Sequence, residues 1–221
     1  MMNIIKIILF LPIAFLKVLL VKSKPIEIRY ACIRKLSCQL IKWLGYSLNV
    51  TGIENINIQK PVYYISNHQG TFDPVILVAA NTHNFGFISK IENRKIPFLG
   101  VCAELIGTIH FDRNSRQGNV SMLRKAIKTL KNGKSLLVFP EGTRSKGDHM
   151  NEFKKGTLVP AYMAKATIIP IRIDNAYFLD KPTKSKKLSV RFFEPLYYDD
   201  YKDIDNHELS NKLFDQINIS R

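Results

Sequence analysis

Short apolar runs of β-prone residues alternate with helical apolar patterns along most of this 221-residue chain. The strand-like runs cover residues 48–53, 62–65, 85–89, 108–111, 135–139, 167–173 and 188–193. Helical patterns cover residues 75–80, 96–103, 119–132, 157–165 and 208–217. Alternation of this kind favours parallel strands joined by helical crossovers. The sequence therefore predicts an α/β fold, with a mainly parallel sheet covered by helices on both faces.

Two prolines interrupt these strand patterns. Pro140 follows the apolar run 135–139, and Pro170 falls inside the run 167–173. Because proline cannot donate a backbone hydrogen bond to a sheet ladder, we expect each at a strand end or on an edge strand.

Several polar residues with catalytic or binding potential come shortly after a strand-like run. His68, Arg113 and Glu141 all stand in this position. In open sheets of parallel strands, sites form beyond the carboxyl ends of the strands. We therefore expect these three side chains at one edge of the sheet.

His68 and Asp73 stand on either side of a turn that contains Gly70. Asp73 followed by Pro74 suits the start of a helix, because Asp can cap the first turn and proline loses no bonded N–H there. A strand, a turn and a helix would let the carboxylate reach one imidazole nitrogen and leave the other free. An imidazole oriented in this way is a general base. The alternative is an ordinary turn with a capping Asp and an incidental His.

A second polar stretch, Phe-Pro-Glu-Gly-Thr-Arg-Ser, occupies residues 139–145. Arg144 offers a fork of donors that matches phosphate oxygens, and Gly142 lets the backbone approach a ligand closely. Arg113 supplies a second cation in a similar topological place. The alternatives are a tight turn with a surface Arg, and a local ion pair between Asp112 and Arg113.

Four blocks of sequence occur in a fixed order: Asn-His-Gln-Gly-Thr-Phe-Asp at 67–73, Gly-Thr-Ile-His-Phe-Asp-Arg at 107–113, Phe-Pro-Glu-Gly-Thr-Arg-Ser at 139–145 and Ile-Ile-Pro-Ile at 168–171. Together they resemble the glycerolipid acyltransferase family, in particular its 1-acyl-sn-glycerol-3-phosphate (lysophosphatidate) acyltransferases. The resemblance covers residues 45–195. Gly70 and His110 depart from the residues usual in that family.

The resemblance implies transfer of a fatty acyl group from an acyl thioester, acyl-CoA or acyl-ACP (acyl carrier protein), to the free hydroxyl of 1-acylglycerol-3-phosphate, giving phosphatidic acid. It implies that His68 and Asp73 are catalytic. It also implies a set of substrate-binding residues: Lys90, Arg113, Glu141, Gly142, Thr143 and Arg144. No metal or redox cofactor is expected, because the His and carboxylate residues lack ligand spacing. The alternatives are an acyltransferase for another lysophospholipid or for glycerol-3-phosphate, and a non-enzymatic basic adaptor for membranes.

The charge balance points to anionic partners. The chain has 33 Lys and Arg against 18 Asp and Glu, a formal net charge of +15. Such an excess favours binding to anionic surfaces or phosphorylated molecules. Charge alone leaves nucleic acid, an acidic membrane surface and phosphorylated substrates open. With what the resemblance implies, we expect anionic membrane lipids, lysophosphatidic acid and acyl-CoA or acyl carrier protein as partners, and no nucleic acid.

The N-terminal part of the chain predicts a helical hairpin associated with a membrane. Residues 4–21 are apolar except for Lys6, Pro12 and Lys17, and residues 26–46 form a basic amphipathic pattern. The first stretch is borderline for a spanning helix, which needs about 20 predominantly apolar residues. Lys6 and Lys17 would share one face, which suits a helix in the interface. Spanning and interfacial attachment both stay open, and a buried core helix is the alternative.

These features divide the chain into a membrane anchor at residues 1–46 and an acyltransferase catalytic domain at residues 47–221. If the first helix spans the bilayer, the basic residues after it place the catalytic domain on the cytoplasmic face of the membrane.

Overall fold

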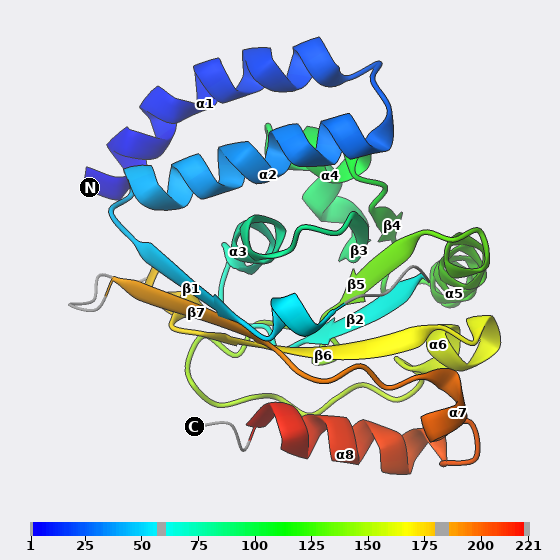
Figure 1. Cartoon of the computed structure of the whole chain (residues 1–221). Coiled ribbons are helices and arrows are strands. Elements are labelled where there is room, and N and C mark those ends of the chain that lie inside the picture. Colours follow the sequence, from blue (N-terminus) through cyan, green and yellow to red (C-terminus); the bar gives the residue numbers. More distant parts are fainter. Residues whose placement is uncertain (1, 57–60, 180–185, 219–221) are drawn as a thin grey trace.

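Figure 1 shows the computed structural model of the chain, in which residues 2–56, 61–179 and 186–218 are described. Within these residues the backbone forms a seven-stranded sheet in the spatial order β1-β7-β6-β2-β5-β3-β4. Its strands are β1 (Ser47–Thr51), β2 (Val62–Ser66), β3 (Phe85–Lys90), β4 (Ile109–Phe111), β5 (Ser135–Val138), β6 (Thr167–Asp174) and β7 (Lys187–Phe192). Neighbouring strands pair in parallel, except that β6 and β7 are antiparallel. The predicted mainly parallel sheet is confirmed.

Helices cover both faces of this sheet (Figure 1). One face carries α1 (Met2–Val21), α2 (Ile26–Trp43), α3 (Asp73–Ala80) and α4 (Leu99–Leu105), and the other carries α5 (Arg116–Lys131), α6 (Val159–Ala164), α7 (Tyr198–Tyr201) and α8 (Asn206–Asn218). Successive strand residues point to opposite faces. In β2, Val62 and Tyr64 join the core under α2 and α3, whereas Tyr63 and Ile65 join the core under α5 and α6.

The N-terminal hairpin consists of α1 and α2, and its two helices are buried to different degrees. On α2, Leu36 and Leu40 lie in the same hydrophobic core as α3 and the sheet. On α1, Ala14 and Val18 are fully buried, whereas Ile13 remains 63% exposed. The outer face of α1 carries a row of exposed large apolar side chains: Ile5, Ile8, Leu9, Ile13, Phe15, Leu16, Leu19 and Leu20. The alternative of a buried core helix is therefore wrong for α1.

None of the helices in the described part of the chain combines the length and apolarity needed to cross a membrane.

The structure confirms the prediction for one of the two strand prolines, Pro140, and contradicts it for the other, Pro170. Pro140 lies two residues beyond the end of β5, as predicted, but Pro170 lies within β6, which is flanked by β7 and β2. The edge prediction for Pro170 is therefore wrong. The N–H of Ile168 donates to the carbonyl of Leu196, and the carbonyl of Pro170 accepts from the N–H of Phe193. The pairing shifts by one residue between Ile171–Phe192 and Ile168–Leu196, which makes a bulge beside Pro170. Bulges are places where a sheet tolerates a proline.

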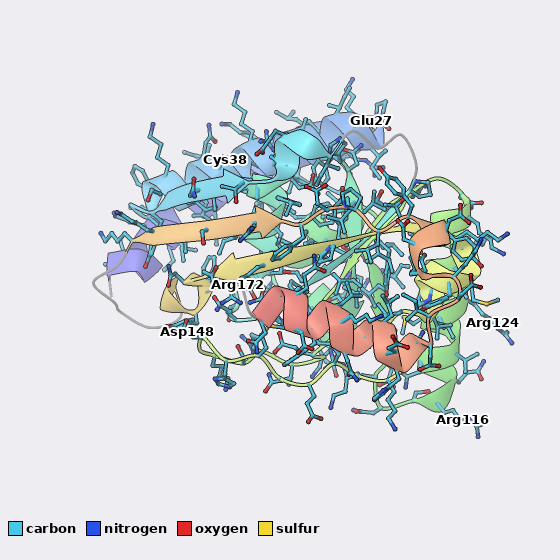
Figure 2. All side chains as sticks on the ribbon, turned by 60° about the horizontal axis from the view of Figure 1, so that its bottom comes forward. Glu27, Cys38, Arg116, Arg124, Asp148 and Arg172 are labelled. Atoms are coloured by element: carbon cyan, nitrogen blue, oxygen red, sulfur yellow. The ribbon has the colours of Figure 1, made fainter. Side chains whose placement is uncertain are left out.

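Arg172 on β6 joins the sheet to the end of α8 (Figure 2). Its side chain is only 3% exposed, and its Nε donates to Asp174 Oδ1 at 2.8 Å. Its Nη1 donates to the backbone carbonyls of Ile217 and Asn218 in the last turn of α8. These carbonyls have no partner within the helix, and a cation at a helix C-terminus also interacts favourably with the negative end of the helix dipole.

We predict that Arg172→Leu lowers the free energy of unfolding by about 2 kcal/mol, because hydrogen bonds to a charged group contribute about 1.5 to 3 kcal/mol. Arg191 is the matched control, since it stands opposite Arg172 on β7 but is exposed. Arg191→Leu should change stability by no more than about 0.5 kcal/mol. Urea denaturation measures both values. Equal effects of the two substitutions would contradict the role given to Arg172.

Candidate active site

His68 and Asp73 form a hydrogen-bonded pair at the carboxyl end of β2. His68 lies two residues beyond the end of β2, and Asp73 is the first residue of α3. His68 Nδ1 lies 2.7 Å from Asp73 Oδ2. The same carboxylate accepts the backbone N–H of Gln69 at 2.6 Å and that of Gly70 at 3.0 Å. The turn between strand and helix thus folds the carboxylate back onto the ring, which is the geometry that the spacing predicts.

Burial and hydrogen bonds act in opposite directions on the charge of Asp73. Its side chain is fully buried. Burial raises the pKa of Asp73 above its usual value, while the hydrogen bonds from His68, Gly70 and Gln69 work in the opposite direction. All these donors favour the carboxylate, which therefore holds a proton on His68 Nδ1 and can stabilise an imidazolium.

The imidazole of His68 is held from a second direction by aromatic rings. It stacks on Phe139, with ring centroids 4.0 Å apart and ring planes 15° apart. Phe139 in turn stacks on Phe87 at 6.2 Å. The His68 side chain keeps 19% of its surface exposed, and in the described part of the chain no protein group bonds its Nε2. Nε2 therefore keeps a free lone pair, which is the proton acceptor of an oriented general base.

Glu141 supports the loop that carries His68. Its side chain is fully buried, and its Oε1 accepts the backbone N–H of His68 at 2.6 Å. Its Oε2 accepts the backbone N–H of Asn151 at 2.7 Å and the side-chain amide of the same residue at 3.0 Å. Burial raises the pKa of Glu141, and the bonds from Asn151 and His68 oppose that rise. With both oxygens occupied, Glu141 is placed to hold the loop, and this position favours support over contact with a substrate.

Two further side chains tie the loop to the end of β6. Asn67 exchanges two hydrogen bonds with the backbone of Ile173, at 2.9 Å and 2.7 Å. Gln69 Oε1 accepts the N–H of Ala176 at 3.0 Å. Sequence reasoning missed both residues. Their positions could have indicated this role. Both residues flank His68, and because neighbouring side chains of an extended chain point in opposite directions, both point away from His68 and into the fold.

Arg113 and Arg144 contact the loops that carry His68 and Glu141. Arg144 is exposed, and its Nη1 donates to Thr71 Oγ1 in the turn between His68 and Asp73. Arg113 Nη1 donates to the carbonyl of Gly142, which has a left-handed φ of +71°. Partial burial lowers the pKa of Arg113, although the nearby Glu92 opposes this effect. A guanidinium keeps its charge under such a shift, so both arginines are cations available to an anionic ligand.

The remaining predicted binding residues lie at the same edge of the sheet. Thr143 is exposed between Gly142 and Arg144. Lys90 is exposed at the end of β3, and its side chain has no hydrogen bond or ion pair within the described residues. The roles of these residues in substrate binding stay predictions.

A family model described as Acyltransferase matches residues 47–174, which is more than half of the chain and includes the His68 and Glu141 loops. The chain therefore belongs to the acyltransferase family, and the resemblance seen in the sequence is confirmed.

Two of the relatives that match the chain are named as 1-acyl-sn-glycerol-3-phosphate acyltransferases. The chain is 33% identical over 142 residues to the chloroplastic 1-acyl-sn-glycerol-3-phosphate acyltransferase LPAT1 of Arabidopsis thaliana, covering 64% of this chain and 40% of the relative. It is 32% identical over 151 residues to the 1-acyl-sn-glycerol-3-phosphate acyltransferase of Borreliella burgdorferi, covering 67% and 60%. The matches thus cover 40% to 60% of the length of these relatives.

A solved structure shows the same fold. The 1-acyl-sn-glycerophosphate (LPA) acyltransferase PlsC from Thermotoga maritima superposes with a TM-score of 0.81 at 26% sequence identity. The superposition covers 98% of this chain and 93% of PlsC, so the helical hairpin is included together with the sheet.

We predict that Glu141→Ala lowers the free energy of unfolding by about 1 to 3 kcal/mol, because it leaves the buried donors of His68 and Asn151 without an acceptor. Thr143→Ala, at an exposed position two residues along, should leave stability unchanged. Thermal and urea denaturation of the two variants measure the difference. A Glu141→Ala protein as stable as the parent would show that the carboxylate does not brace the loop.

Proposed function

We propose that this chain transfers a fatty acyl group from an acyl thioester to the free hydroxyl of 1-acylglycerol-3-phosphate, giving phosphatidic acid. The observation that carries the proposal is the His68–Asp73 pair, with its 2.7 Å contact and its free Nε2 at the carboxyl edge of the sheet. The printed activity of the relatives and of the structural neighbour supports the choice of substrates.

In the proposed reaction, His68 Nε2 takes the proton of the acceptor hydroxyl as the hydroxyl oxygen attacks the thioester carbonyl carbon. The new C–O bond forms, the C–S bond breaks, and the proton held by His68 passes to the departing thiolate. The buried carboxylate of Asp73 stabilises the imidazolium that exists between these two proton transfers. No covalent acyl-enzyme is needed, because the acceptor oxygen itself is the nucleophile.

The phosphate of the acceptor is bound by the cations beside the His68 loop. Arg144 now donates to a neutral hydroxyl on Thr71, and Arg113 donates to a backbone carbonyl. A phosphate accepts from a guanidinium more strongly than either of these neutral groups, because the bonds are charge-assisted and can be bidentate. Lys90 and Thr143 are further donors at the same edge. The donor thioester, on coenzyme A or on acyl carrier protein, supplies the acyl group as a substrate, so no resident cofactor is part of the proposal.

Attachment to the membrane belongs to the same proposal. The exposed apolar face of α1 enters the bilayer surface, and exposed basic residues near the turn of the hairpin, Lys17, Lys22 and Lys24, contact anionic headgroups. The predicted cytoplasmic location of the catalytic domain is part of this proposal as well.

The test is a panel of acceptors offered to the purified chain with an acyl-CoA donor and with an acyl-ACP donor. We predict acylation of lysophosphatidate in preference to glycerol-3-phosphate and to lysolipids without the free phosphate. His68→Ala should lower the rate by about 10²- to 10⁴-fold, the usual contribution of a general base. His207→Ala, an exposed His on α8, is the matched control and should keep full activity. Preference for another acceptor, or full activity of a folded His68→Ala protein, would overturn the proposal.

A further inference from the structure

The exposed apolar surface of the chain extends beyond α1. In the segment between β3 and α4, Ile91 is 37% exposed and Ile96 is 40% exposed, and Leu99 at the start of α4 is 37% exposed. We call residues 91–99 the β3–α4 segment. A monomeric soluble surface normally carries such residues singly, so three within nine positions are a feature to explain.

The β3–α4 segment adjoins the exposed face of α1. Phe98, within the segment, packs edge-on against Phe15 of α1, with ring centroids 6.5 Å apart. Phe15 itself is 41% exposed. Figure 1 shows α4 on the same side of the sheet as α1 and α2. The apolar side chains of α1 and of the segment therefore belong to neighbouring parts of one surface.

The backbone of the segment is held in an unfavourable conformation. Phe98 has φ +65° and ψ −54°, and the N–H of Leu99 donates to the carbonyl of Pro97 at 2.7 Å. This is a γ-turn of the rare, strained kind, and a bulky residue at positive φ is an outlier. The turn is fixed by its neighbours: Arg94 pairs with Glu104, and a Cβ added at Gly100 would lie only 2.1 Å from the Arg94 carbonyl oxygen. Strain that the surrounding structure maintains is typical of functional surfaces.

The β3–α4 segment lies at the edge of the sheet that carries the candidate active site. It begins directly after Lys90, at the carboxyl end of β3, which is the edge of the sheet that carries His68. The exposed charged side chains between the apolar ones are the basic Arg94 and Lys95 and the acidic Glu92, and Arg94 is paired with Glu104. Apolar side chains mixed with cations suit the surface of an anionic bilayer.

We propose that the β3–α4 segment is a second membrane contact, which acts with α1 to turn the carboxyl edge of the sheet towards the bilayer. An acceptor lipid could then present its phosphate and free hydroxyl to His68 while its acyl chain stays in the lipid. This inference rests on the proposed function for the identity of the acceptor, but the membrane contact itself does not depend on catalysis.

The test compares the triple variant Ile91→Ser/Ile96→Ser/Leu99→Ser with the parent chain, leaving Phe98 in place. The matched control is Val120→Ser/Met163→Ser, which removes exposed apolar side chains from α5 and α6 on the other helical layer. Each protein is assayed on long-chain lysophosphatidate in anionic vesicles and on a short-chain lysophosphatidate below its critical micelle concentration. Flotation with the same vesicles measures binding without catalysis.

We predict that the triple variant binds vesicles about tenfold or more weakly than the parent, as expected from the apolar area removed. Its acylation rate on vesicles should fall by a similar factor. Its rate on the dissolved acceptor should stay within about twofold of the parent, since none of the three residues touches the His68–Asp73 pair. The control variant should behave as the parent does in all three measurements. Circular dichroism checks folding, and the single variant Ile96→Ser serves if the triple variant does not fold.

Three results would overturn the inference. Equal losses on vesicles and on the dissolved acceptor would make the segment part of catalysis. Unchanged vesicle binding with an unchanged oligomeric state would make it an ordinary solvated loop. Unchanged vesicle binding with a changed oligomeric state would make it a contact between two copies of the chain. If the parent chain acylates neither acceptor, the proposed function fails, and flotation still decides the membrane contact separately.

Discussion

The site depends on one buried carboxylate, that of Asp73. It accepts hydrogen bonds from the ring of His68 and from the backbone of Gln69 and Gly70, so one group fixes both the imidazole and the turn that carries it. Asp73 also begins α3, whose residues Val75–Ala80 are buried against the sheet and α2. The hydrophobic core therefore orients the imidazole, and the base is as rigid as the packing behind it.

Much of this arrangement could be predicted from local sequence. Alternating apolar runs gave every strand within two residues of its observed ends, because strand periodicity and turn residues are local signals. The contact between His68 and Asp73 also follows from local geometry, since both residues lie in one strand–turn–helix connection. The apolar N-terminal stretch predicted a membrane-associated helical hairpin. The hairpin is present and the outer face of α1 is apolar and exposed, while its association with a membrane stays a prediction.

Contacts between distant parts of the chain could not be predicted in this way. Nothing local in the sequence shows that Phe139 stacks on His68, or that Asn151 occupies the second oxygen of Glu141. The direction of β7 and the place of Pro170 in an interior strand depend on how the last strands return to the sheet. Glu141 illustrates the limit most clearly: its neighbours in sequence suggest a ligand contact, and only its partners in space show that both of its carboxylate oxygens hold the loop.

Asp73 holds His68 in one tautomer, with the proton on Nδ1 and a free lone pair on Nε2. Nitrogen-15 NMR of the histidine-labelled chain tests this directly, with the signal of His68 assigned among the five histidines by its loss in His68→Gln. At a pH where the ring is neutral, we predict a protonated Nδ1 and an unprotonated Nε2. Asp73→Asn should lose that preference. A neutral ring protonated on Nε2, or one that exchanges freely between both tautomers, would contradict the role assigned to Asp73.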